Sequence, residues 1–360
     1  MKRVFISDCE GPISKNDNAF EATSHFIPNG DRLFALVSKY DDVLAGVLEK
    51  PGYNAGDTLK LILPFLKAFG VTDEDLKEFS AKHLVLIPGS KNTLEHLRSL
   101  AASFIVSTSY ENYIRALCEN LSFPFENTYC TRLSINNYLF PDPERLRLKE
   151  LAGEIIQKPM IAIPSSANSL EDFSKQDRGI IARLDDIFWD EIGHMDAGTI
   201  FNEVKPIGGH EKVEAIKDAA QKTKMSLSDV MYVGDSITDV EAFKLVREDG
   251  GLTVSFNGNE YAVKNAEIAV LSENNTVTAL IADLFCEFEK QAVLNVLKNW
   301  NSENLRNAPV DKSMLESFFA LHPHKLPKVQ IVTPQNMKTL IRQSSEFRRK
   351  IRGEAVGGLG

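Results

Sequence analysis

Residues 3–12 read RVFISDCEGP, a short apolar run followed at once by a turn that carries two carboxylates. The run RVFIS is rich in β-favouring residues, and Asp8 and Glu10 come directly after it, before a Gly-Pro pair. This pattern predicts a buried strand that delivers acidic side chains to a loop. Taken alone, an Asp-x-Glu at a strand end is weak evidence for a functional site, because acidic residues are common in turns.

Three more apolar runs, at long intervals along the chain, also end in polar or small residues. They are residues 103–106 before Ser107 and Thr108, residues 230–233 before Gly234 and Asp235, and residues 252–256 before Asn257 and Gly258. Helical patterns lie between the runs, at residues 90–100, 111–121, 211–222 and 239–246. The alternation predicts an α/β fold with a doubly wound parallel sheet, in which ligands bind at the carboxyl ends of the strands.

The remaining segments predict insertions into this core. Residues 15–88 carry helical patterns, at 55–69 and 73–83, with little strand signal, so they predict a helical cap inserted after the first strand. We expect a core of residues 1–14, 89–142 and 205–285, an accessory insertion of unknown shape at 143–204, and a helical C-terminal extension at 286–360. In the tail, one long helical pattern runs from Thr276 through Trp300.

Composition places the chain among ordinary globular proteins, with 43% hydrophobic and 25% charged residues in 360. A formal net charge of -9 argues against a nucleic-acid partner, because such binding rests on cationic contacts. No stretch approaches the roughly 18 apolar residues of a membrane span, and the N-terminal run is too short for a signal peptide. The four cysteines show no metal-like spacing and are expected to be reduced. We therefore expect a cytoplasmic protein with no membrane partner.

The polar residues at the ends of the runs form an ordered set. Asp8 and Glu10 are followed by Ser107, then by Lys212 at the start of a helical pattern, and then by an acidic pair in the sequence GDSITD, residues 234–239. Four separate segments thus supply matching parts. A carboxylate that attacks a phosphate ester approaches an anion, so a divalent cation and a lysine are needed to offset the repulsion.

In these motifs the sequence resembles the haloacid dehalogenase superfamily, and is closest to its phosphoserine phosphatase and phosphoserine-homoserine phosphotransferase branch. The resemblance implies that Asp8 is a nucleophile that carries a transient aspartyl-phosphate, and that Glu10 exchanges protons with the leaving group and with water. It also implies Mg²⁺ as cofactor, with Asp8, Asp235, Asp239 and the main-chain carbonyl of Glu10 at the metal. Asp239 is expected to hold a metal-bound water or to orient the lysine.

The same resemblance implies a phosphate-binding set of Gly11, Ser107, Thr108 and Lys212. Lys212 is preferred to Lys205 because it lies 23 residues before Asp235 (235 minus 212), a spacing similar to that of the branch. Two departures from the family pattern are the glutamate at position 10, where the family usually has aspartate, and a proline at position 12. Pro12 lacks an amide donor, which leaves a substrate copied from phosphoserine phosphatase in doubt.

The expected function is a phosphatase acting on a small phosphorylated metabolite, with a phosphotransferase of the same mechanism as an alternative. A third reading is a non-catalytic regulatory or assembly subunit, since the sequence is also similar to an archaeal group labelled as an energy-converting hydrogenase subunit. Association of identical chains, or with a larger complex, would then use the insertion or the C-terminal extension. The basic cluster Arg348, Arg349, Lys350 and Arg352 is interpreted as a solvated helix face, and His210 as an exposed residue outside the site.

Overall fold

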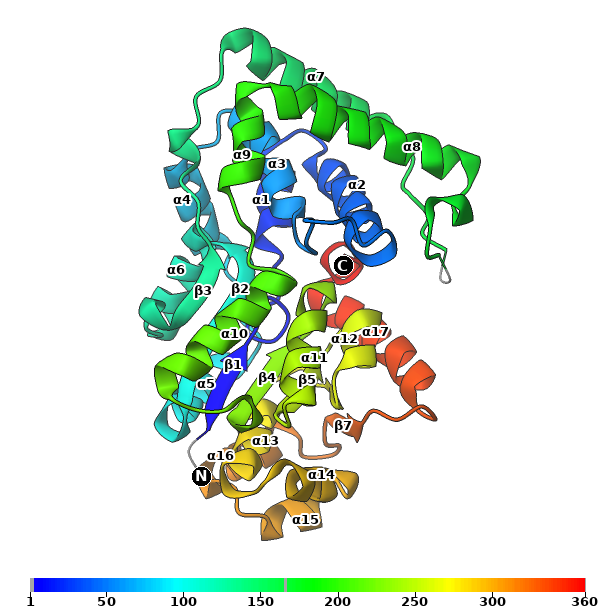
Figure 1. Ribbon diagram of the computed structural model, residues 1–360. Coiled ribbons are helices and arrows are strands. Elements are labelled where there is room, and N and C mark those ends of the chain that lie inside the picture. Colours follow the sequence, from blue (N-terminus) through cyan, green and yellow to red (C-terminus); the bar gives the residue numbers. More distant parts are fainter. Residues whose placement is uncertain (1–2, 165–166, 360) are drawn as a thin grey trace.

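The computed structural model describes residues 3–164 and 167–359, and these form an α/β structure around a seven-stranded sheet (Figure 1). In chain order the strands are β1 (Val4–Ser7), β2 (Ala102–Tyr110), β3 (Thr128–Thr131), β4 (Val230–Gly234), β5 (Leu252–Phe256), β6 (Ile268–Leu271) and β7 (Lys328–Ile331). Across the sheet the order is β3-β2-β1-β4-β5-β6-β7. Neighbouring strands are parallel except β6 and β7, which are antiparallel. The predicted doubly wound parallel sheet is confirmed.

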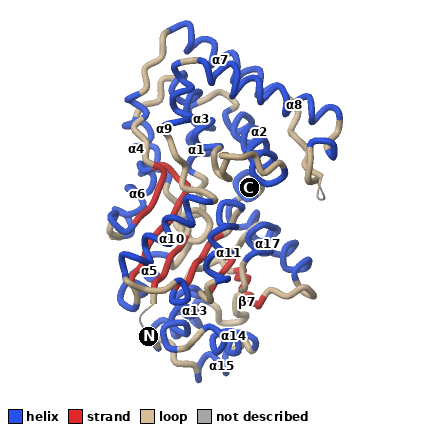
Figure 2. Tube along the Cα trace, in the orientation of Figure 1, coloured by secondary structure: helices blue, strands red, loops and turns tan. Residues whose placement is uncertain are grey.

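Helices cover both faces of the sheet. Successive side chains of a strand point to opposite sides, so each central strand contributes to a hydrophobic cluster on either face. Phe5 and Met231 pack into one hydrophobic cluster, whereas Ile6 and Tyr232 pack into another. The first cluster includes α5 (Ser90–Leu100), α6 (Glu111–Leu121) and α13 (Thr276–Glu287), and the second includes α10 (His210–Thr223), α11 (Val240–Glu248) and α12 (Glu260–Asn265). The sheet is therefore buried on both sides, which explains the nearly continuous apolar runs of its central strands. Figure 2 shows the strands enclosed between these helices.

Both insertions contribute to one helical cap beyond the carboxyl ends of the strands (Figure 1). The first supplies α1 (Asn18–Phe26), α2 (Gly30–Asp42), α3 (Thr58–Ala68) and α4 (Asp73–His83), and the second supplies α7 (Asp142–Gln157), α8 (Lys175–Asp185) and α9 (Thr199–Glu203). Their apolar side chains share a single hydrophobic cluster, in which the rings of Phe65 and Phe188 meet edge to face at 6.1 Å. The segment expected to be an accessory insertion is thus half of the cap.

The C-terminal extension differs from its predicted form in two ways. The long helical pattern is broken at Phe288, whose backbone is extended, so that α13 ends at Glu287 and α14 (Lys290–Lys298) begins anew. After α15 (Ser302–Asn307) and α16 (Lys312–Leu321), the chain adds β7 to the edge of the sheet. It then returns through α17 (Met337–Arg352) and α18 (Glu354–Gly357) toward the cap, where Figure 1 places the C-terminus.

Candidate active site

The register of the sheet brings the predicted site residues to one edge. Ser7, the last residue of β1, pairs with Ile105 in β2 and with Val233 in β4. Asp8 therefore leaves the sheet at the level of Val106, inside β2, and of Gly234, the last residue of β4, and its amide donates to the Val233 carbonyl at 2.8 Å. Parallel strands share one carboxyl edge, so the loops after β1 and β4 converge there beside the second half of β2.

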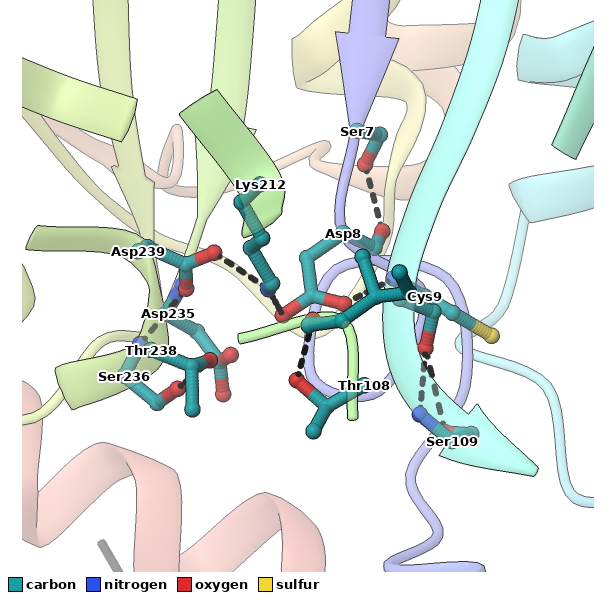
Figure 3. A network of polar contacts seen from close by, with 12 residues as sticks. Ser7, Asp8, Cys9, Thr108, Ser109, Lys212, Asp235, Ser236, Thr238 and Asp239 are labelled. Carbon is teal, nitrogen blue, oxygen red and sulfur yellow. Dashed lines mark hydrogen bonds and ion pairs between the residues drawn. The ribbon is translucent and has the colours of Figure 1, made fainter. Parts of the chain in front are cut away.

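Lys212 lies between two carboxylates and links them (Figure 3). Its Nζ is 2.6 Å from Asp8 Oδ2 and 2.7 Å from Asp239 Oδ1, and all three side chains are buried. Burial by itself lowers the pKa of Lys212, but the charges of Asp239 and Asp8 outweigh it and raise that pKa above its ordinary value. Lys205, the alternative, is exposed. The geometry thus places Lys212 in the candidate site, and His210 is exposed as expected.

The carboxylate of Asp8 is held on both oxygens. Oδ2 accepts from Lys212, and Oδ1 accepts from the Cys9 amide at 2.6 Å. Burial raises the pKa of Asp8, Lys212 opposes that change, and the nearby charges of Asp239 and Asp235 add to it. Lys212 is the cation that bonds to Asp8 and Asp239, whereas Asp235 is bonded by two arginines of the C-terminal helix.

Asp239 organises the loop after β4. Its Oδ1 accepts from Lys212 and, at 2.6 Å, from the hydroxyl of Tyr232, while its Oδ2 accepts from the amides of Asp235 at 2.8 Å and Ser236 at 3.0 Å. Four donors thus occupy this carboxylate. Sequence reasoning did not find Tyr232, which reads as an ordinary apolar residue within the strand.

Among the described residues, one oxygen from each of Asp8, Asp235 and Asp239 can be chosen so that all lie within 4.8 Å of one another. Hard carboxylate oxygens at that spacing fit a magnesium ion. Asp239 already accepts four hydrogen bonds, so Asp8 and Asp235 are the carboxylates better placed to hold a metal directly. Asp239 contacts Lys212, and its expected supporting role stays a prediction.

The turn after β1 requires glycine at position 11. Gly11 has a φ of +99°, and a Cβ there would overlap the carboxylate of Asp235. The preceding Glu10 reaches the cap, where its Oε1 accepts from the Asn18 amide at the start of α1, at 2.7 Å. Burial raises the pKa of Glu10 well above its ordinary value, and the adjacent Asp17 adds to this effect. Such surroundings favour the neutral form of this carboxyl group.

Ser107 and Thr108 lie within β2, in the part that extends beyond its pairing with β1. The Ser107 hydroxyl is buried and donates to Ser109 Oγ at 3.0 Å, and Thr108 Oγ1 donates to the Ile207 carbonyl at 3.0 Å. Both residues line a cavity of about 100 Å³ together with Asp8, Glu10 and Asp235. Their predicted role as donors to a phosphate group stays a prediction. Asp17, Asp41, Asp42, Phe34 and Leu59 of the cap also line this cavity.

The expectation that the basic C-terminal cluster is a solvated face is wrong for two of its members. The side chains of Arg348 and Arg352 are only 4% exposed, and both donate to Asp235 Oδ2. Arg349 and Lys350 are exposed, as expected. The sequence carries one signal for this arrangement, since Ser344, Arg348 and Arg352 recur every four residues and so share one face of α17.

A sequence family described as haloacid dehalogenase-like hydrolase matches residues 91–283, which is more than half of the chain. The chain belongs to this family of hydrolases. Comparison with curated protein sequences gives no match. Among solved structures, a gene product of Archaeoglobus fulgidus is similar with a TM-score of 0.81 and 25% identity, over 100% of this chain and 99% of the other. That match includes the cap and the C-terminal segment, and it shows that the whole architecture recurs.

Two phosphoserine phosphatase structures are more distant. One, a phospho-aspartyl intermediate analogue, has a TM-score of 0.44 and 13% identity over 76% of this chain and 95% of the other. The other, a substrate-bound complex, has a TM-score of 0.45, again at 13% identity over 76% and 95%. These two likenesses are too weak to assign an activity. None of the helices in residues 3–164 and 167–359 combines the length and the apolar character needed to cross a membrane.

Proposed function

We propose that this hydrolase is a magnesium-dependent phosphomonoesterase that acts on a small phosphorylated metabolite through an aspartyl-phosphate on Asp8. The observation that supports it most strongly is the buried Asp8 carboxylate, fixed at 2.6 Å from Lys212, on the wall of the cavity between core and cap. Burying a carboxylate with a lysine and further acids beside it costs folding free energy, so its presence favours a functional role. The same cost argues against a non-catalytic assembly subunit, which has no need of this cluster.

In the first half-reaction, an oxygen of Asp8 attacks phosphorus and the bond from phosphorus to the ester oxygen breaks. Glu10, whose pKa is raised mainly by burial, gives its proton to the departing oxygen. Lys212 stays on Asp8 and stabilises the negative charge on the phosphoryl group. A magnesium ion held by Asp8, Asp235 and the main-chain carbonyl of Glu10 would supply further positive charge against the repulsion between carboxylate and phosphate.

In the second half-reaction, Glu10 takes a proton from a water molecule that attacks the phosphorus of the aspartyl-phosphate. The bond between phosphorus and the Asp8 oxygen breaks, which returns the free carboxylate and releases inorganic phosphate. One residue thus serves as acid and then as base. The cavity of about 100 Å³ under the cap supports a small substrate.

The test is a phosphate-release assay on a panel of small phosphorylated metabolites, with Mg²⁺ and with a chelator, in which Asp8→Asn serves as the blank. We expect release from at least one alkyl phosphate in the presence of Mg²⁺ and none from the blank. Equal release by the wild type and by Asp8→Asn would contradict the proposal. Adding an alcohol acceptor to the same assay separates transfer from hydrolysis, because a phosphotransferase would form a new ester instead of free phosphate.

A further inference from the structure

The segment of residues 337–359, α17 and α18 with the residues after them, passes over the active site and contacts both the core and the cap; we refer to it as the strap. Its first half is anchored on the core, where Leu340 packs with Val263 and the Ser344 hydroxyl donates to the Gly258 carbonyl at 2.6 Å. Its end is anchored on the cap, whose hydrophobic cluster includes Val356 and Leu359. The strap therefore spans the boundary between the two parts.

Arg348 lies on the face of the strap that meets Asp235. Its Nη1 donates to the Asp235 main-chain carbonyl at 3.2 Å and to Asp235 Oδ2. The same carboxylate packs against the backbone of Gly11. Asp235 is thus held from two sides, by the turn after β1 and by a guanidinium from the C-terminal helix.

Arg352, one turn further along α17, joins three segments. Its Nη1 is 3.1 Å from Asp235 Oδ2, its Nε donates to the Lys15 carbonyl at 2.9 Å, and its Nη2 donates to the Asn16 carbonyl. Lys15 and Asn16 lie where the chain leaves the loop after β1 and enters the cap. A planar guanidinium can reach three acceptors at once, whereas a lysine ammonium offers no such fixed fork.

We propose that Arg348 and Arg352 are positioning residues of this active site. Arg348 fixes the carboxylate of Asp235, and Arg352 connects that carboxylate to the hinge of the cap at residues 15–16. The inference rests on the proposed function only in taking Asp235 as a metal ligand. Hydrogen-bond partners of metal ligands commonly set metal affinity as well as orientation, and their loss costs about 10–100-fold.

Two physical effects of the arginines on a metal have opposite signs, and this makes the inference testable. A positive charge beside Asp235 repels a cation, so removing that charge alone would tighten metal binding. Fixing the carboxylate in the right orientation favours metal binding, so losing the fork would weaken it. Arg352→Lys keeps the charge and removes the fork, which isolates the second effect.

The experiment uses the full chain and measures Mn²⁺ binding directly by electron paramagnetic resonance, without substrate. We expect the Mn²⁺ dissociation constant to rise by about tenfold or more in Arg352→Lys and in Arg348→Lys. Arg349→Ala is the matched control, because Arg349 is exposed on the same helix and its nearest acidic partner, Glu354, is 3.9 Å away. That variant should bind Mn²⁺ as the wild type does, and unchanged or tighter binding in both lysine variants would overturn the positioning role.

A second measurement addresses the cap hinge. Amide hydrogen exchange around residues 15–18 should speed up in Arg352→Lys and not in Arg349→Ala, because only Arg352 bonds the carbonyls of Lys15 and Asn16. Unchanged exchange there would overturn the coupling of the hinge to Asp235. Asp235→Asn separates this inference from the proposed function. If that variant kept full Mn²⁺ affinity, the metal assignment would be wrong, while the exchange result would still decide the role of Arg352.

Discussion

Two regions far apart in the sequence supply the charged groups that meet at Asp235. The loops after β1 and β4, together with α10, supply Asp8, Asp239 and Lys212, and Lys212 bonds to both carboxylates. The strap supplies Arg348 and Arg352, which bond to Asp235 and to main-chain carbonyls near the cap hinge. The first group surrounds the place where chemistry is expected, and the second connects that place to the start of the cap at residues 15–16. Substitutions in the first region should therefore impair turnover, whereas substitutions in the strap should impair metal affinity and the packing of residues 15–16.

The largest expected effect, and the sharpest test of this difference between the two regions, comes from removing the nucleophile. Asp8→Asn should abolish phosphatase activity, because an amide does not attack phosphorus and is a weaker metal ligand. The strap should remain docked in this variant, since neither Arg348 nor Arg352 bonds to Asp8. Phosphate release measures the first expectation and hydrogen exchange of residues 337–359 measures the second. Wild-type turnover in Asp8→Asn would refute the role of the strand-end loops.

Removing the proton donor should have the next largest effect, and one that depends on the substrate. Glu10→Gln keeps the main-chain carbonyl but cannot protonate the departing oxygen, so alkyl phosphates should slow by roughly 10² to 10⁴-fold. An aryl phosphate leaves as a stabilised anion, so its first step should suffer less and the aspartyl-phosphate should accumulate. Rapid-quench kinetics would then show a burst of phenol. Equal slowing of both ester classes, with no trapped phosphoenzyme, would reduce Glu10 to a structural part of the loop.

Loss of the Lys212 ammonium group should have the third largest effect on turnover. Lys212→Ala should lower turnover by about a hundredfold or more, because a preorganised charge beside the phosphoryl group is lost. The substitution also leaves Asp8 and Asp239 buried without their shared partner, so the melting temperature should fall as well. Lys205→Ala is the matched control, because Lys205 is exposed before α10, and this variant should change neither quantity. A reversed pattern would move the catalytic lysine seven residues toward the N-terminus (212 minus 205).

The sequence was sufficient for the parts of the molecule in which a buried apolar run precedes a polar turn. Asp8 and Asp235 follow such runs, and helices α4, α5 and α6 have the predicted bounds because their apolar spacing is regular. The strands β3, β6 and β7, of four residues each, were missed. Arg348 could not be assigned from local sequence, because its partner Asp235 is 113 residues away and only tertiary packing brings them together.

The missed strands and the strap share one cause. Residues 328–331, which form β7, read KVQI, and only their pairing with β6 makes them a strand. Likewise, the four basic residues near the end of α17 look alike in sequence. The docking of that helix against α12 and the cap divides them into two buried arginines and two exposed cations. Sequence pattern therefore predicts where the chemistry lies, whereas the elements that close the site depend on long-range contacts.

The smallest expected effect concerns a contact between α5 and α13, away from the active site. It tests whether a substitution outside the two compared regions leaves the site unchanged. His96 in α5 has its Nε2 2.7 Å from Asp283 Oδ1 in α13, and the hydrogen bond to Asp283 raises the pKa of His96 despite partial burial. A folded-state pKa above the unfolded value means that protonated His96 stabilises the fold fully below the unfolded pKa of about 6.5, and that this contribution is lost as pH rises through the folded pKa. His96→Gln should therefore lower the free energy of unfolding by about 1 kcal/mol or less near pH 6, after allowance for solvent screening. The difference from the wild type should shrink near pH ~9, where the histidine is neutral in both states. Urea unfolding at the two pH values measures this difference.

Because His96 contacts neither Asp235 nor the strap, turnover and Mn²⁺ affinity should not change in His96→Gln. A loss of metal affinity in this variant would show that the extension reaches the site through α13 as well as through α17.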